Sequence, residues 1–82
     1  MDYHKWVSRN PLRKWRTENR ATMMEFAHRI GVSLTSIQFW ERGVNRPTDK
    51  SIAKIAKGMG VDAGTLRAKW TRWVKTGRKI GA

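Results

Sequence analysis

The sequence predicts an all-α fold, a compact domain of five short helices. Apolar residues recur at helical spacing along several segments, and no segment shows the alternation that a half-buried strand requires. A residue type that commonly caps helices precedes each of these segments. The chain has 82 residues, of which 39% are hydrophobic, so it can form one small core but not two.

The predicted helices follow one another with tight turns. They cover residues 10–19, 22–31, 33–43, 48–60 and 62–75. Their N-caps are, in order, Asn10, Thr22, Ser33, Thr48 and Asp62. Pro11 suits the first position of its helix, and Glu25 completes the spacing of a capping box with Thr22. Gly31 and Gly43 suit helix C-termini, because glycine tolerates the left-handed backbone conformation.

Two terminal segments fall outside the predicted domain, which covers residues 10–75. Residues 1–9 mix charged and apolar side chains without a clear period, so they are interpreted as a basic N-terminal arm or a short helical turn. Residues 76–82 are interpreted as a frayed basic C-terminal tail. Basic residues concentrate at both ends of the chain.

The charge of the chain points to its partner. There are 18 Lys and Arg residues against 6 Asp and Glu residues, a formal net charge of +12. Such a charge on a short chain opposes compaction and indicates an anionic partner, with nucleic acid ahead of a membrane surface. No apolar run is long enough to span a bilayer, so a cytoplasmic, nucleoid-associated protein without a membrane partner is expected.

The second and third predicted helices are joined by a very short turn around Gly31. This is the spacing of a helix-turn-helix motif, which covers residues 22–43. Ala27 is small where the two helices are expected to cross closely, and Ile37 is apolar where both face the core. Each of these features is common by itself, but together at this spacing they are a strong signal.

With this motif, the sequence resembles the Cro and lambda-repressor-like (Xre-type) helix-turn-helix proteins over roughly residues 12–66. The matching residues are Leu12, Trp15, Arg16, Thr22, Phe26, Ala27, Ile30, Gly31, Val32, Ile37, Trp40, Glu41, Arg42, Gly43 and Pro47. The resemblance implies a transcription regulator that places the helix over 34–42 in the DNA major groove and binds as a dimer. It also implies that Glu41 pairs with Arg16 and thereby sets the angle of this helix.

The sequence departs from the family pattern at three places. The family usually has a Gln that touches the DNA backbone where this chain has Met23. It usually has a Gly and a large apolar residue where this chain has Arg20 and Ala21. The outward positions of the third helix are commonly polar, but here they include Leu34 and Phe39.

Adjacent aromatic residues in the third helix are expected to face different ways. Projected at 100° per residue, Trp40 shares one side with Ile37, which predicts that both belong to the core. Phe39 then lies toward the outside, unless a partner covers it. Trp40 is therefore a structural residue in this interpretation, together with Ile37.

The predicted base-reading residues flank the outer side of the same helix. They are Leu34, Thr35, Gln38 and Phe39. Apolar side chains can contact thymine methyl groups and Gln can pair with adenine, so a preference for A·T steps is hypothesised. Alternatively, Leu34 and Phe39 are ordinary exposed apolar residues, or they pack against the N-terminal arm.

A second set of residues is expected to contact phosphates rather than bases. These residues are Ser33, Arg42, Arg46, Met23 and Lys50. By family position, Arg42 and Arg46 lie beside the reading helix. Ser33, as an N-cap, places backbone N–H groups near the same phosphates.

The last predicted helix carries an apolar stripe that includes Trp70, Trp73 and Val74. These residues either cover the small core or form a dimer interface, as the last helix does in the resembling family. Symmetric dimers are the commonest small oligomers, and a dimer reads two half-sites about one DNA turn apart. A homodimer on DNA is favoured.

Catalysis is not expected, and neither are cofactors, metal ions or small-molecule ligands. Glu25, Glu41, Asp49 and Asp62 all have structural interpretations at helix ends or in the predicted ion pair. The remaining two acids do not form a general acid–base pair. His4 and His28 are far apart, and the chain has no Cys, so a metal site is not indicated.

The predicted function is that of a sequence-specific double-stranded DNA-binding transcription regulator, which represses transcription as a dimer on an inverted repeat. Two alternatives stay open. The helix-turn-helix could be a protein-interaction module, such as an antitoxin or a polymerase-binding factor, with Leu34 and Phe39 as its anchors. It could also be a non-specific architectural DNA binder, whose affinity falls with salt on every sequence alike.

Overall fold

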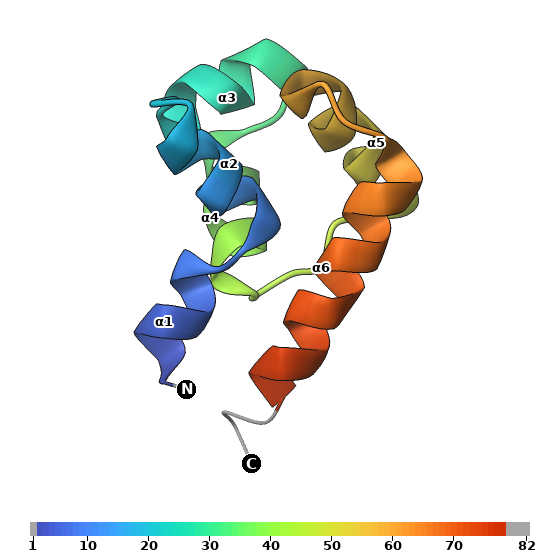
Figure 1. The fold of residues 1–82 in the computed structure, drawn as a ribbon. Coiled ribbons are helices and arrows are strands. Elements are labelled where there is room, and N and C mark those ends of the chain that lie inside the picture. Colours follow the sequence, from blue (N-terminus) through green and yellow to red (C-terminus); the bar gives the residue numbers. More distant parts are fainter. Residues whose placement is uncertain (1, 79–82) are drawn as a thin grey trace.

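The computed structural model describes residues 2–78, which form six α-helices and no strand. The helices are α1 (Tyr3–Ser8), α2 (Pro11–Glu18), α3 (Met23–Ile30), α4 (Leu34–Arg42), α5 (Asp49–Met59) and α6 (Ala63–Arg78). Figure 1 shows the helices around one core, with α1 and the C-terminal half of α6 at the same end of the molecule. The predicted all-α class is confirmed, with one helix more than predicted.

The predicted caps explain where the helices begin and end. Side-chain oxygens of five residues each accept a backbone N–H from the first turn of α2 to α6; these residues are Asn10, Thr22, Ser33, Thr48 and Asp62. Gly31, Gly43 and Gly60 end α3, α4 and α5 with φ angles of +72°, +75° and +73°. This conformation costs other residues about 1–2 kcal/mol, which is why glycine ends these helices.

The turn between α2 and α3 has an unusual backbone conformation for its sequence. In the described part of the chain, Arg20 is the one non-glycine residue with a positive φ, at 54°. This is the position at which the resembling family usually has glycine. The next residue, Ala21, is held in place because its carbonyl accepts a hydrogen bond of 2.8 Å from the guanidinium of Arg16. Arg20 therefore adopts the left-handed backbone conformation that glycine adopts most easily.

The N-terminal segment forms a short packed helix, so of the two interpretations of this segment the helical turn is the one found, and the arm is wrong for residues 3–8. Asp2 caps α1 by accepting the N–H of Lys5 at 2.8 Å. Trp6 and Val7 are buried, with 8% and 6% of their surface exposed. A helix of six residues is too short to show a hydrophobic period, so its burial depends on the partner it packs against.

That partner is α6, and two tryptophans join the helices. The rings of Trp6 and Trp73 stack with centroids 4.0 Å apart and planes within 2° of each other. Each indole N–H donates to the other residue's backbone carbonyl, and both hydrogen bonds are 2.7 Å long. The contact thus buries two large aromatic side chains and satisfies both of their polar atoms.

Two glycines without side chains leave the space that the ring of Trp6 occupies. A Cβ atom added to Gly43 or to Gly77 would lie 2.3 Å or 2.2 Å from this ring, which is closer than any real contact. Helix α6 continues through Gly77 to Arg78, so the prediction of a frayed tail is wrong for residues 76–78. Residues 79–82 lie outside the described residues.

The core contains side chains from all six helices. Its largest fully buried apolar members are Leu12, Phe26, Ile37, Ile55, Leu66 and Trp70. For Trp70 and Trp73 the sequence leaves open a core position or a dimer interface; they are 1% and 5% exposed within a single chain. The core position is therefore the one that they occupy, and Val74 alone of this set is half-buried.

The substitution Trp6→Ala is expected to lower the free energy of unfolding by about 3–5 kcal/mol, since it removes a buried aromatic side chain and leaves a cavity. Urea unfolding followed by far-UV circular dichroism measures this loss. Tyr3→Phe is the control in the same helix, because it removes only an exposed 3.3 Å hydrogen bond to the carbonyl of Arg42. A loss below about 1 kcal/mol for Trp6→Ala would contradict the packing role of α1.

Candidate nucleic-acid interface

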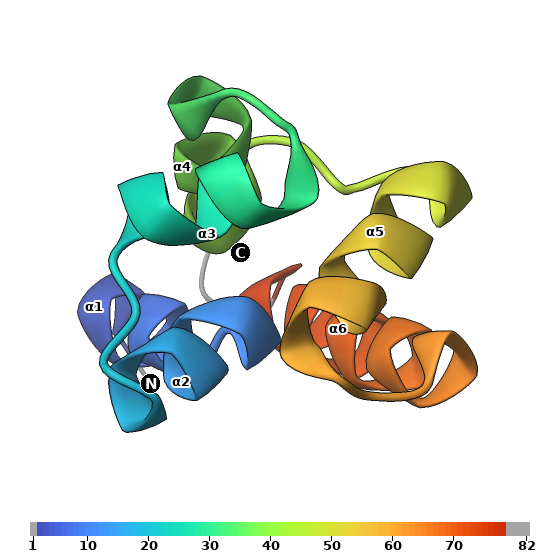
Figure 2. The ribbon, with the colours of Figure 1, turned by 90° about the horizontal axis from the view of Figure 1, so that it is seen from above.

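Helices α3 and α4 form the predicted helix-turn-helix. Ala27 lies at their contact with 4% of its surface exposed, and its carbonyl accepts the N–H of Val32 at 3.0 Å. Gly31 provides the left-handed residue that reverses the chain between them. In Figure 2, α4 lies along one side of the molecule, and α2 and α6 lie along the opposite side. The outer face of α4 is thus at the surface.

The side chains of α4 divide between the core and the surface as predicted. Ile37 is fully buried and Trp40 is 8% exposed, whereas its neighbour Phe39 is 38% exposed. Thr35 is exposed, and Leu34 and Gln38 are half-buried. The four residues predicted to read bases therefore lie on a single helix with at least part of each side chain accessible.

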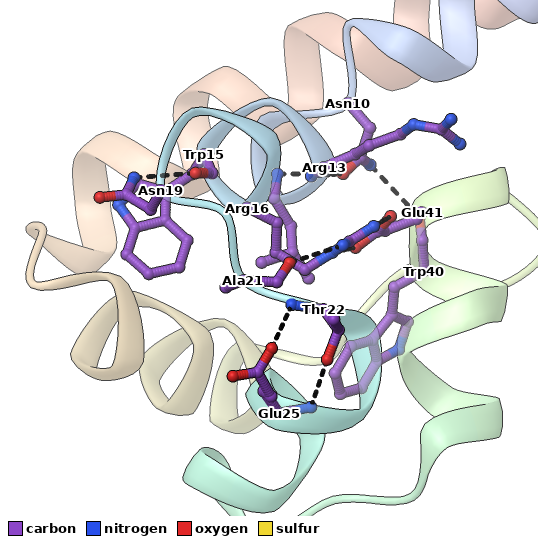
Figure 3. Close-up of polar contacts among 11 residues, drawn as sticks. Asn10, Arg13, Trp15, Arg16, Asn19, Ala21, Thr22, Glu25, Trp40 and Glu41 are labelled. Carbon is purple, nitrogen blue, oxygen red and sulfur yellow. Dashed lines mark hydrogen bonds and ion pairs between the residues drawn. The ribbon is translucent and has the colours of Figure 1, made fainter.

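The predicted ion pair between α2 and α4 is present (Figure 3). Two guanidinium nitrogens of Arg16, Nε and Nη2, donate to the two carboxylate oxygens of Glu41 at 2.7 Å and 2.8 Å. The third nitrogen, Nη1, donates to the carbonyl of Ala21. Glu41 is fully buried, and the Arg16 side chain is 12% exposed. Through Arg16, α4 is therefore connected both to α2 and to Ala21 in the turn before α3.

The energetics of this pair follow from its geometry. The hydrogen bond to Glu41 raises the pKa of Arg16, and it outweighs burial, which acts in the opposite direction. The guanidinium is therefore positively charged at neutral pH. Glu41 is the only acid in the sequence of α4, and because it is turned inward the outer face of this helix presents no carboxylate to an anionic partner.

Two further contacts hold the C-terminal end of α4, and no sequence pattern predicts either of them. Asn10 is fully buried, and its Nδ2 donates to the carbonyl of Trp40 at 3.4 Å, while its Oδ1 caps α2. The hydroxyl of Tyr3 donates to the carbonyl of Arg42 at 3.3 Å. These partners are 30 and 39 residues from their acceptors, so no local pattern indicates them.

The residues predicted to contact phosphates lie on several elements. Ser33 is exposed at the start of α4, where its hydroxyl oxygen accepts the N–H of Ser36. Arg42 is exposed at the end of α4, and Lys50 is exposed in the first turn of α5. Met23 is half-buried at the first position of α3. These four positions are at helix ends, where backbone phosphates are commonly bound.

Arg46 differs from these four residues because it already has a partner. Its Nη2 donates to the hydroxyl of Thr71 on α6 at 2.5 Å. The side chain is exposed, and this contact uses only one of its three guanidinium nitrogens.

Comparison with known protein families agrees with this geometry. The family model described as Helix-turn-helix matches residues 12–66, which is more than half of the chain. The chain belongs to this helix-turn-helix family, in its Cro and lambda-repressor-like (Xre-type) form, a family of DNA-binding regulators. Neither the comparison with curated proteins nor the comparison with solved structures gives a match.

The structure adds two findings about other kinds of site. Among residues 2–78, no helix is both long enough and apolar enough to cross a membrane. The same residues include no group of three or more His, Cys, Asp or Glu side chains arranged to hold a metal ion.

Breaking the buried ion pair on one side is expected to be costly. Glu41→Gln leaves the guanidinium of Arg16 largely buried without its carboxylate, and the expected loss in the free energy of unfolding is about 3–5 kcal/mol. Arg67→Gln is the matched control, because it breaks the exposed pair between Arg67 and Asp49, 3.2 Å apart. Exposed pairs contribute at most about 1 kcal/mol. Equal losses in urea unfolding would argue against a special role for the buried pair.

The capping box of α3 makes the stability of the fold depend on pH in the acid range. The backbone N–H of Thr22 donates to Glu25 and lowers the pKa of this carboxyl below its ordinary value of 4.5. A lowered pKa contributes stability that is present above the ordinary value and is lost as the pH falls through the lowered one. We expect Glu25→Gln to unfold at lower temperature than the wild type at neutral pH, and the difference to shrink as the pH falls below 4.5. Thermal melts across this range measure it; a constant difference would contradict the assignment.

Proposed function

We propose that the protein is a sequence-specific regulator that inserts α4 into the major groove of double-stranded DNA. The observation that carries this proposal is the outer face of α4. It combines a threonine, a glutamine and a partly exposed phenylalanine with a terminal arginine, and its one acid is turned inward and neutralised. A major groove admits an α-helix of this kind, and its base edges offer partners for each of these groups.

The base-reading roles follow from side-chain chemistry. Gln38 can donate to and accept from the edge of adenine, which is the pairing with the most geometric specificity in this set. Phe39 and Leu34 can contact thymine methyl groups, and Thr35 offers both a methyl and a hydroxyl group. The proposed operator half-site is therefore rich in A·T pairs where α4 enters the groove.

Contacts to phosphates position α4 in the groove. Arg42 and the N-terminal end of α4 at Ser33 lie at opposite ends of the helix, so they can bind phosphates on either side of the groove. Lys50 and Met23 lie at the starts of α5 and α3, where backbone N–H groups favour anions. The net charge of +12 adds affinity that carries no sequence information.

We further propose that the protein represses transcription in the cytoplasm as a homodimer on an inverted repeat. Support comes from family resemblance and from the general preference of small proteins for two-fold symmetry. Trp70 and Trp73 are buried within the chain and Val74 is half-buried against the core, so an interface on α6 would rest mainly on its exposed residues. Charge repulsion between copies favours assembly on DNA, where phosphates neutralise it.

Selection of binding sites from a random pool of double-stranded DNA tests this function at roughly 0.15 M salt, where non-specific attraction is partly screened. Enrichment of an inverted repeat with half-sites about 10 base pairs apart is the expected result. Enrichment of a single half-site would support base reading by α4 but would contradict the proposal that the protein binds as a dimer. Binding without enrichment would overturn sequence-specific function in favour of architectural binding, and absence of binding would favour a protein-interaction module.

Two substitutions in α4 separate reading of bases from positioning. Gln38→Ala is expected to relax the preference at one base pair, with a loss of about 1–3 kcal/mol in discrimination. Arg42→Ala is expected to weaken binding to all sequences alike and to reduce the salt dependence of affinity by about one phosphate contact. Repeating the selection and measuring affinity against salt distinguish the two effects. If the Gln38→Ala variant selected the same preferred sequence as the wild type, the proposed pairing of Gln38 with adenine would be wrong.

A further inference from the structure

A groove of about 470 Å³ lies between α2 and α6, and neither the fold nor the proposed DNA contact uses it. Its lining includes Lys14, Trp15, Met59, Val61, Lys69 and Arg72. The groove is a surface depression rather than an enclosed cavity, so a ligand reaches it without any movement of the helices.

The floor of the groove is apolar and incompletely covered. Trp15 packs edge-on against Phe26, with ring centroids 5.6 Å apart, and stays half-buried. Met59 beside it is also half-buried, and Val61 in the α5–α6 turn is 42% exposed. These three side chains leave an apolar strip open to solvent. Burial of such a strip against a partner is favourable in free energy, because it removes apolar surface from water.

The rim of the groove is basic. Arg9 and Lys14 lie on the side of α2, and Lys69 and Arg72 lie on the side of α6, against the single acid Glu18. All five side chains are exposed. A second copy of this chain would bring a net charge of +12 to a rim that is already positive, so an acidic partner is the one that matches.

We propose that this groove binds an acidic amphipathic helix of a partner protein. One apolar face of such a helix covers the strip formed by Trp15, Met59 and Val61, and its carboxylates pair with the rim. A nucleic-acid backbone matches the rim but has no apolar groups for the aliphatic part of the floor. The combination of an apolar floor with a basic rim therefore favours a peptide over a phosphate chain.

The groove and the proposed DNA contact lie on different sides of the molecule. Arg16 points from α2 toward α4, as its pair with Glu41 shows. Lys14 and Glu18, each two positions away along the helix, project about 200° from that direction and line the groove. Figure 2 places α4 on the side opposite to α2 and α6. A peptide can therefore occupy the groove while α4 is bound to DNA.

A synthetic helical peptide with one stripe of Leu and with Glu on its other faces provides the probe. Its fluorescein label reports affinity by anisotropy, and amide NMR of the full chain locates the contact. We expect the peptide to shift the amides of Lys14, Val61 and Lys69 and to leave those of Thr35 and Gln38 unchanged. A scrambled peptide of the same composition, which lacks the stripe, is expected to bind at least about tenfold more weakly.

Matched charge reversals test the rim. The double variant Lys69→Glu with Arg72→Glu is expected to weaken peptide binding by at least about tenfold. The control, Lys54→Glu with Lys57→Glu, makes the same change in net charge on α5 and is expected to change affinity less than about twofold. Val61→Ser tests the floor without any change of charge, and it too is expected to weaken binding.

Several outcomes would contradict the proposal that the groove binds an acidic amphipathic helix. Equal binding of the scrambled peptide, or equal loss in both double variants, would mean that charge alone attracts the peptide. NMR shifts concentrated on α4 would place the peptide on the helix-turn-helix. A single-stranded oligonucleotide that displaces the peptide and shifts the same amides would assign the groove to nucleic acid. The site selection above, repeated with the Lys69→Glu and Arg72→Glu variant, reports DNA reading separately from all of these results.

Discussion

The structure depends first on the ion pair between Arg16 and Glu41. It places two charges in a region from which water is largely excluded, where an unpaired charge is far more costly than a pair. Because its hydrogen bonds have one good geometry, the pair allows α4 only one orientation against α2. A well-packed apolar contact in this place would stabilise the fold as well but would specify the helix angle less sharply. The proposed reading of DNA by α4 requires that angle.

Around this pair, the chain adds contacts that the family pattern does not include. Asn10 caps α2 and also donates to the backbone of α4, and Tyr3 of α1 donates to the last residue of α4. The match to the family begins at residue 12, so both contacts come from residues that precede it. The N-terminal segment thus supports the helix-turn-helix through Tyr3 and Asn10, and its buried residues Trp6 and Val7 belong to the core.

Local signals allowed most of the fold to be predicted from the sequence. A cap such as Thr22 and a helix end such as Gly31 act within a few residues, so their patterns are visible in the chain itself. The burial of Trp6 could not be predicted, because it depends on a partner 67 residues away. For Trp73, the apolar stripe indicated a covered face but not whether the same chain or another covers it. The groove between α2 and α6 likewise arises only when distant segments meet.

The stacked pair of Trp6 and Trp73 has a consequence for the order in which the chain folds. The contacts of α3 with α4 and with α5 join segments that are close in sequence, whereas this pair closes a loop of nearly the whole chain. Because the entropy cost of closure grows with loop length, we expect this pair to form after the central helices have assembled. In that order of events, the contact between α1 and α6 acts mainly on the rate of unfolding, because interactions made late in folding slow the escape from the native state. We therefore expect the lifetime of the folded state to depend on the two terminal helices and the rate of folding to depend on the central ones.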